Sequence, residues 1–350
     1  MSTIYLDEQG SEVKKKGELL IIEKDDKTIA EIPLAQLDRM VIIGNIQITT
    51  PALALLLDNE IPVSFITTYG NYRGKLKPPT HKNIMLRLKQ YECYNNKTFR
   101  LNHSKEIIRA KLKNGKTFLQ KHWRNNPEIE INQEIKGIEA ALRRLDNVES
   151  IKEIMGLEGM AAKGYFSAFG KLVKKEFKFE KRTRRPPKDP VNALLSLGYT
   201  LLYNELLSAV EAIGFDPYLG FFHEIEYGRP SMAVDMMEEF RFLIEGLALT
   251  LINKEILSLE NFIEQDNGGF YLNEKGREEF YHHYEKRITT EVQYPISSSP
   301  LGGEGQSLPR TCSGGEGKNV NYRRIFCYQV ERLARVVKGE VERYIGYETR

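Results

Sequence analysis

Leu19-Leu20-Ile21-Ile22-Glu23-Lys24-Asp25-Asp26-Lys27-Thr28-Ile29-Ala30-Glu31-Ile32 is the stretch that decides how this chain begins to fold. Two apolar runs, at residues 19–22 and 28–32, flank the charged segment 24–27. Short apolar runs separated by polar turn residues are typical of antiparallel strands joined by a tight turn. We therefore expect a β-hairpin here.

Further strand-like segments follow the hairpin. Residues 40–43 and 62–66 are short and apolar, and the Ala- and Leu-rich stretch 51–57 between them predicts a short helix, because proline favours the first turn of a helix. Glycines and prolines then interrupt the pattern as far as Pro79. The sequence predicts a small N-terminal β-rich domain over residues 1–79, which we expect to mediate dimerisation on grounds given below.

Residues 80–350 carry the apolar spacing that is typical of helices. Helices are expected at residues 105–122, 131–145, 151–177, 190–213, 231–254 and 322–344. The segment 297–319 is different, since it is rich in Gly, Ser and Pro and is expected to be a flexible insert. The predicted fold class is therefore α+β, with the small N-terminal β-rich domain followed by a larger, mostly α-helical domain.

Composition leaves the class of partner open. The chain has 350 residues, and 41% of them are hydrophobic, which is enough to form the cores of two domains. The 51 basic and 48 acidic residues give a net charge of +3, so overall charge neither indicates nor excludes nucleic acid. The first 20 residues have no apolar signal core, and we expect no segment long and apolar enough to cross a bilayer. A cytoplasmic protein with no membrane partner is expected.

Two acidic residues are the first candidates for a site. Asp235 and Glu238 lie three residues apart in a helical pattern, so they share one face and could approach one cation. Acidic residues in the first turns of a helix are more often solvated or interact with the helix dipole. His223 adds weight, because it ends an aromatic run and precedes the turn 227–230, which would fold it back against the acidic helix. A lone histidine is itself more often a hydrogen-bonded core residue.

Glu158 is the third candidate. It lies in Gly156-Leu157-Glu158-Gly159-Met160-Ala161-Ala162, where small residues suit close packing and a buried carboxylate would need a cation or a donor. Two carboxylates and one imidazole suit Mn²⁺ or Mg²⁺, since hard cations prefer oxygen ligands and the nitrogen shifts the preference toward Mn²⁺. The sequence lacks the His-Glu-x-x-His pattern of zinc enzymes at this histidine, because Tyr227 stands where the second histidine would be.

Positive charge gathers between Lys171 and Lys188. This segment contains nine basic and two acidic residues, a local charge of +7. Such a run is usually a solvated face, but this one lies between candidate ligand segments, and Lys and Arg supply the phosphate contacts that dominate affinity for DNA. The residues expected to bind DNA are Lys181, Arg182, Arg184, Arg185 and Lys188.

Taken together, these segments resemble the CRISPR-associated protein one family. The motifs that carry the resemblance are Arg184-Arg185-Pro186-Pro187-Lys188-Asp189-Pro190-Val191-Asn192-Ala193-Leu194-Leu195-Ser196, Asp216-Pro217-Tyr218-Leu219-Gly220-Phe221-Phe222-His223, Asp235-Met236-Met237-Glu238-Glu239-Phe240-Arg241 and Glu158-Gly159-Met160-Ala161-Ala162. The order of β-rich and helical parts agrees as well. The resemblance covers nearly the whole chain, and the Gly- and Ser-rich insert departs from it.

The resemblance implies a metal-dependent integrase that inserts DNA fragments, or spacers, at CRISPR repeats by transesterification. It implies that Glu158, His223 and Glu238 are catalytic residues and ligands of Mn²⁺ or Mg²⁺, with Asp235 nearby as an alternate or outer ligand. It also implies a homodimer formed through the β-rich domain, which associates with CRISPR-associated protein two to hold a double-stranded DNA fragment against CRISPR repeat DNA. Endonuclease activity is compatible with the same site.

Some assignments stay open at this point. Asn192 and Tyr165 are candidates for hydrogen bonds near the phosphate, but packing explains them about as well. The same metal site could hydrolyse branched DNA, as in a structure-specific repair nuclease, if water replaced the attacking hydroxyl. A non-catalytic DNA-binding scaffold, with carboxylates that serve only as surface charge, is the alternative from another class.

Overall fold

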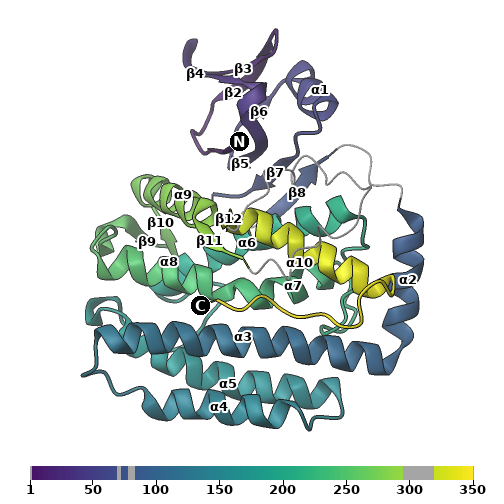
Figure 1. The fold of residues 1–350 in the computed structure, drawn as a ribbon. Coiled ribbons are helices and arrows are strands. Elements are labelled where there is room, and N and C mark those ends of the chain that lie inside the picture. Colours follow the sequence, from purple (N-terminus) through teal and green to yellow (C-terminus); the bar gives the residue numbers. More distant parts are fainter. Residues whose placement is uncertain (1, 69–71, 78–82, 295–318, 350) are drawn as a thin grey trace. The chain divides into compact units, whose positions relative to one another are not determined.

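The computed structural model describes residues 2–68, 72–77, 83–294 and 319–349. The described residues fall into two compact units, residues 2–68 with 72–77 and residues 83–294 with 319–349, and each unit is described by itself. Strands dominate the first unit and helices the second, so the predicted α+β class is confirmed (Figure 1). The expected flexible insert lies outside the described residues, apart from Asn319, which begins strand β12 (Asn319–Asn321).

The first unit contains two four-stranded sheets. The expected hairpin is present as β3 (Leu19–Lys24) and β4 (Lys27–Pro33), which pair antiparallel. Asp25 and Asp26 form its turn with positive φ angles, a conformation that short polar side chains tolerate. The remaining strands are β2 (Glu12–Lys16) and β6 (Gln47–Ile48) beside the hairpin, and β1 (Ser2–Leu6), β5 (Leu37–Ile43), β7 (Val63–Ile66) and β8 (Tyr72–Leu76) in the other sheet.

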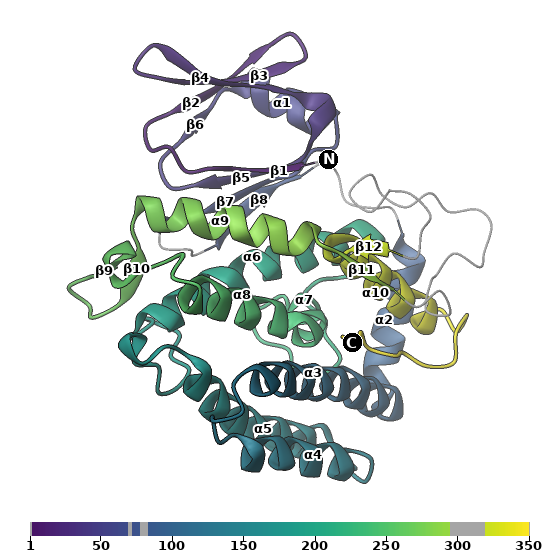
Figure 2. The same ribbon diagram turned by 60° about the vertical axis from the view of Figure 1, so that its left-hand side comes forward.

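Figure 2 shows these sheets with helix α1 (Thr50–Asp58). All of them contribute side chains to one apolar core. Leu20 and Ile22 of β3 belong to it, as do Met40 and Ile42 of β5. Alternate residues of a strand point to the same face, which is why β3 contributes Leu20 and Ile22, and β5 contributes Met40 and Ile42. The predicted short helix and the strands at residues 40–43 and 62–66 are confirmed.

The second unit is built mainly from helices. They are α2 (Ile84–Asn95), α3 (Lys97–Asn125), α4 (Asn132–Leu145), α5 (Ile151–Leu172), α6 (Pro190–Ile213), α7 (Ser231–Met237), α8 (Arg241–Asn253), α9 (Glu274–Thr289) and α10 (Tyr322–Val337). Short strand pairs, β9 (Phe262–Glu264) with β10 (Phe270–Leu272) and β11 (Glu291–Gln293) with β12, connect some of them.

Several predicted helix boundaries were wrong. The helix expected at residues 151–177 ends at Leu172, and the one expected at 322–344 ends at Val337. The segment 231–254 is not one helix, because the 3₁₀ turn η3 (Glu238–Phe240) separates α7 from α8. Helix α9 was not predicted. These differences arise where tertiary contacts, rather than apolar spacing, end a helix.

Helix α6 also corrects an expectation about membranes. The sequence was expected to contain no segment long and apolar enough to cross a bilayer, but α6 is such a segment by length and composition. However, 78% of its apolar window is buried inside the protein, as in the core helix of a globular domain. Asp189 caps its first turn by accepting a hydrogen bond from the backbone N–H of Asn192 at 2.8 Å.

Helix α3 is the long element to which the candidate site is attached. Helices α4 and α5 pack along it (Figures 1 and 2). The turn η3 lies against it as well. Ser150 caps the start of helix α5, because its hydroxyl accepts a hydrogen bond from the backbone N–H of Glu153 at 3.3 Å. This packing brings side chains of α3, α5 and η3 to one place.

Candidate active site

Glu158 and Glu238 meet around one lysine. The ammonium nitrogen of Lys111, on α3, lies 2.5 Å from Oε1 of Glu158 and 2.6 Å from Oε2 of Glu238. Glu158 comes from α5 and Glu238 from η3, 80 residues further along the chain. Two of the three predicted catalytic residues are therefore brought together by the fold, with a positive charge between them.

Glu238 is held more tightly than Glu158. Its side chain is only 4% exposed, whereas that of Glu158 is 23% exposed. Arg241 donates two hydrogen bonds to the Glu238 carboxylate, at 2.7 and 2.8 Å. Burial would raise the pKa of Glu238, but the charges of Arg241 and Lys111 outweigh it and hold that pKa well below its usual range. Glu238 is therefore a carboxylate at every physiological pH.

The surroundings of Glu158 differ from the expectation. Small residues around it were expected to allow close packing, yet a Cβ added at Gly156 or Gly159 would meet nothing within 4 Å. Gly156 and Gly159 therefore leave open space near a half-buried carboxylate. Such space suits access by another molecule better than it suits a packed helix interface.

His223 is fixed by Asp235. Its Nδ1 lies 2.7 Å from Oδ1 of Asp235, which also accepts the backbone N–H of His223 at 3.0 Å. The other oxygen, Oδ2, accepts the backbone N–H groups of Phe221 and Phe222, at 2.6 and 2.9 Å. Because a carboxylate can only accept hydrogen bonds, the neutral imidazole carries its proton on Nδ1. Its Nε2 then keeps a lone pair.

These contacts define the role of Asp235. Its side chain is fully buried, and both oxygens are occupied by the backbone and the imidazole. The geometry therefore favours a role for Asp235 in holding His223, rather than as a direct ligand of a metal ion. A carboxylate that holds an imidazole in this way is the usual partner of a metal-binding histidine.

The loop that ends in His223 is anchored at several points. Gln90 of α2 donates to the carbonyls of Asp216 and Leu219, and Arg100 of α3 donates to the carbonyl of Phe221 at 3.1 Å. Gly220 is required at the closest approach, because a Cβ there would lie 2.5 Å from Oδ2 of Asp235.

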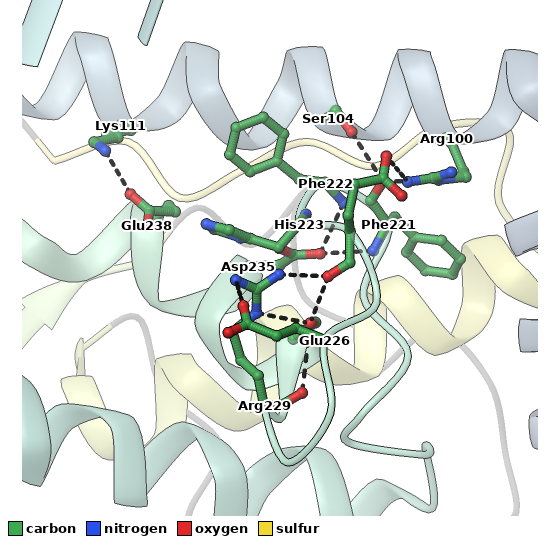
Figure 3. A network of polar contacts seen from close by, with 12 residues as sticks. Arg100, Ser104, Lys111, Phe221, Phe222, His223, Glu226, Arg229, Asp235 and Glu238 are labelled. Carbon is green, nitrogen blue, oxygen red and sulfur yellow. Dashed lines mark hydrogen bonds and ion pairs between the residues drawn. The ribbon is translucent and has the colours of Figure 1, made fainter. Parts of the chain in front are cut away.

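Figure 3 shows the polar network that joins this loop, α3 and the α7–η3 segment. Asp235 and Glu238 lie one helical turn apart, so the imidazole is tied to the same short segment that carries the second carboxylate. Within the described ranges, however, no group of three or more His, Cys, Asp or Glu side chains is arranged to hold a metal ion. The observed donor set is a carboxylate pair around a cation, with a loop imidazole that is oriented by Asp235 on the adjoining turn.

Tyr165 faces the interior. Its hydroxyl donates to Oε2 of Glu245 at 2.5 Å, and Tyr199 donates to Oε1 of the same carboxylate at 2.7 Å. Burial raises the pKa of Tyr165 well above its usual value, so the phenol keeps its proton and acts as a donor. Packing and Glu245 therefore account for Tyr165. The guanidinium of Arg241 lies 4.9 Å from the Tyr199 ring, which links this cluster to Glu238.

Asn192 and Arg182 also have interior roles. The side chain of Asn192 donates to the carbonyl of Lys181 at 2.8 Å and accepts from Nη1 of Arg182 at 2.8 Å. Arg182 donates further to Ser196 at 3.0 Å, and burial lowers its pKa to about 10. Both side chains hold the basic segment in place. The structure thus gives Arg182 contacts other than those expected of a DNA-binding residue.

Comparison with known proteins decides the family. The family model described as "CRISPR associated protein Cas1" matches residues 4–286. This chain belongs to the Cas1 family. A relative named "CRISPR-associated endonuclease Cas1 1", from Thermodesulfovibrio yellowstonii, is 37% identical over 293 residues, which cover 82% of this chain and 92% of the relative. "CRISPR-associated endonuclease Cas1 3" from Thermus thermophilus is 31% identical over 354 residues, covering 100% of this chain and 98% of the relative.

Solved structures agree with the Cas1 assignment. A CAS1 protein from Thermotoga maritima has a TM-score of 0.79 and 26% identity, and the match covers all of both chains. A structure titled "Casposase bound to integration product" has a TM-score of 0.84 and 25% identity, covering 99% of this chain and 93% of the other. A chain of a "Cas6-RT-Cas1--Cas2 complex" has a TM-score of 0.79 and 24% identity, and the match covers 100% of this chain and 36% of the other. At this identity the similarity supports the fold alone.

Some basic side chains of the segment 171–188 in this Cas1-family chain are already paired with carboxylates. Lys171 forms an ion pair with Glu134 and Lys174 with Glu255, so the local excess of positive charge is smaller than the sequence indicates. The exposed basic residues of the predicted DNA-binding group are Lys181, Arg184, Arg185 and Lys188.

Three functional neighbours were missed from the sequence. Lys111 and Arg241 contact the carboxylates, and Glu245 interacts electrostatically with both of these cations, but none was assigned a role. Lys111 is one of several lysines on α3 and has no distinguishing local pattern. Arg241 follows Glu238 by three residues, which is the spacing of an ion pair on a helix and is the one signal that could have identified it.

Proposed function

We propose that this Cas1-family chain is a CRISPR adaptation integrase that joins the 3′-hydroxyl of a DNA fragment to a phosphodiester at a CRISPR repeat. The observation that carries the proposal is the cationic position shared by Glu158 and Glu238, with His223 oriented by Asp235 on the adjoining turn. Support comes from the family assignment and from the similarity to a casposase bound to its integration product.

The reaction is an exchange of esters. The oxygen of the fragment's 3′-hydroxyl forms a new bond to phosphorus, the bond between phosphorus and the 3′-oxygen of the repeat strand breaks, and the hydroxyl proton passes by way of solvent to the departing oxygen. One phosphodiester is lost and one is formed. No energy-rich cofactor and no covalent bond to the protein are needed.

Glu158, Glu238 and His223 would hold Mn²⁺ or Mg²⁺, which their donor atoms suit: two carboxylates and an imidazole nitrogen whose lone pair is free. The bound ion would lower the pKa of the attacking hydroxyl and neutralise charge that develops on the phosphate. Asp235 orients the imidazole, and Arg241 keeps Glu238 ionised and fixed. Side chains held in place before substrate binds would lower the cost of reaching the transition state.

The exposed residues Lys181, Arg184, Arg185 and Lys188 would contact DNA phosphates and position the strands. Such contacts need no base recognition, which suits an enzyme that accepts fragments of varied sequence. The partners in this proposal are a double-stranded DNA fragment, CRISPR repeat DNA, a second copy bound through the β-rich domain, and CRISPR-associated protein two. The cytoplasm is the compartment where these partners meet.

Hydrolysis is the second candidate reaction. It is favoured by the names of the curated relatives, which are called endonucleases. Water would then attack phosphorus in place of the 3′-hydroxyl, at the same site and with the same ligands.

Strand transfer tests the proposal. The protein, with and without CRISPR-associated protein two, is incubated with a labelled 3′-hydroxyl duplex and a repeat-bearing plasmid in Mn²⁺ or Mg²⁺. Glu158→Gln, His223→Ala and Glu238→Gln should each lower joining by more than about 100-fold while DNA affinity is largely kept, since loss of an outer partner alone typically costs 10- to 100-fold. Glu278→Gln, at an exposed position of α9, is the matched control. Label that is released but never joined to the plasmid would favour the nuclease, and full joining by Glu158→Gln would refute the site.

A further inference from the structure

We propose that Lys111 is a built-in cation of the active site, which holds Glu158 and Glu238 together and competes with the divalent ion for them. The inference rests on the proposed function, because it takes these two carboxylates to be metal ligands. It concerns a residue of helix α3 that the motifs do not include.

The geometry requires a cation between these side chains. Both carboxylate oxygens contact the same nitrogen, so they lie within about 5 Å of one another, where two negative charges repel strongly if nothing separates them. The three side chains are 19%, 23% and 4% exposed for Lys111, Glu158 and Glu238, so water screens the repulsion only in part. The ammonium therefore occupies the position from which a cation can bind both oxygens.

Lys111, rather than Arg241, is the cation that can leave. Arg241 makes two hydrogen bonds to Glu238, its side chain is 16% exposed, and its guanidinium lies over the Tyr199 ring. A lysine ammonium is a single charge at the end of four flexible methylene groups, and it can move aside without loss of a fixed geometry. Because it reaches both carboxylates, its withdrawal removes one contact from Oε1 of Glu158 and one from Oε2 of Glu238, and the latter oxygen keeps its hydrogen bond from Arg241.

Other lysines of α3 are bound differently. Lys113 pairs with Glu348 at 2.8 Å, and Lys116 pairs with Glu139 at 3.5 Å. Each of these contacts joins one lysine to one glutamate near the surface, where an ion pair contributes little. Lys113 lies two residues from Lys111 on the same helix and is a matched control.

The test measures binding of Mn²⁺ alone, by titration calorimetry on the full chain without DNA. Lys111→Gln should bind Mn²⁺ on the order of tenfold more tightly than the wild type, because no resident charge must be displaced. Lys111→Arg keeps the charge and should keep the weaker binding. Lys113→Gln should not differ from the wild type.

Thermal unfolding gives a second readout that does not depend on activity. In EDTA, Lys111→Gln should unfold at a lower temperature than Lys113→Gln, because it leaves two neighbouring carboxylates without their shared cation. Saturating Mn²⁺ should then raise its unfolding temperature by more than that of the wild type. If Lys111→Gln does not fold in EDTA, folding that Mn²⁺ restores supports the proposal, and folding that Mn²⁺ does not restore overturns it.

The outcomes separate this inference from the function on which it rests. Affinity for Mn²⁺ that is equal or lower in Lys111→Gln, together with weaker binding by Glu158→Gln, would overturn the role of Lys111 and leave the metal site standing. Binding of Mn²⁺ that neither Glu158→Gln nor Glu238→Gln weakens would overturn both.

Discussion

Replacing Asp235 with asparagine should disable the candidate site while leaving Glu158, His223 and Glu238 in the chain. Each oxygen of Asp235 accepts two hydrogen bonds: Oδ1 from the backbone and ring of His223, and Oδ2 from the backbone of Phe221 and Phe222. Asparagine has one oxygen and one NH₂ group. Whichever way the amide turns, two donors that were satisfied in the wild type face another donor.

The magnitude follows from this count. An unsatisfied buried donor costs about 1–3 kcal/mol, so the free energy of unfolding should fall by about 2–6 kcal/mol if the NH₂ group faces the two backbone N–H groups of Phe221 and Phe222, and by about 1–3 kcal/mol if it faces His223, whose ring can change tautomer. If the NH₂ group faces the imidazole, Nδ1 must become the acceptor and the ring proton moves to Nε2. That tautomer has no lone pair to offer a metal ion, and affinity for Mn²⁺ should fall by about 10- to 100-fold.

Urea unfolding in EDTA measures the first effect and calorimetric titration with Mn²⁺ the second. Asp216→Asn is the control, because Asp216 lies at the start of the same loop, is only half-buried, and accepts from the backbone of Tyr218 and the hydroxyl of Tyr91. An Asp235→Asn protein that matches this control in both urea midpoint and Mn²⁺ affinity would refute the reasoning.

Two further predictions concern DNA binding and acid stability. Replacing Arg184, Arg185 and Lys188 with alanine should lower the slope of log affinity for DNA against log salt by up to about 3, because each lost phosphate contact lowers it by about 0.9. The control Lys136→Ala, at an exposed position of α4, should leave the slope unchanged. A triple variant with the wild-type slope would show that these three residues do not contact DNA. His103 is buried, and within the described part of the chain neither ring nitrogen has a hydrogen-bond partner. Burial lowers its pKa from 6.5 to about 4, so the stability that depends on the neutral ring is complete above pH 6.5 and is lost as pH falls toward 4, by about 3 kcal/mol in total. Urea unfolding at pH 7 and pH 4.5 should therefore show a smaller acid loss in His103→Phe than in the wild type, and an equal loss would contradict this role.

Much of the fold follows from local pattern. The hairpin β3–β4 is encoded by two apolar runs around a turn in which Asp25 and Asp26 adopt positive φ, and helix α6 is encoded by a proline-initiated apolar run with an aspartate cap. These features depend on residues within a few positions of one another, so the sequence alone was enough to predict them. The break at η3 could not be predicted in this way, because apolar spacing continues through it.

The sequence by itself determined which residue types are present for chemistry: two acidic motifs, a histidine after an aromatic run, and a basic segment. Only the tertiary structure decided how they are used. It placed Lys111 between Glu158 and Glu238, assigned both oxygens of Asp235 to the histidine loop, and turned Tyr165, Asn192 and Arg182 toward the interior. The physical reason is that charge pairing and hydrogen bonding act over a few ångströms in space, whereas the partners come from helices and loops that lie tens of residues apart in the chain.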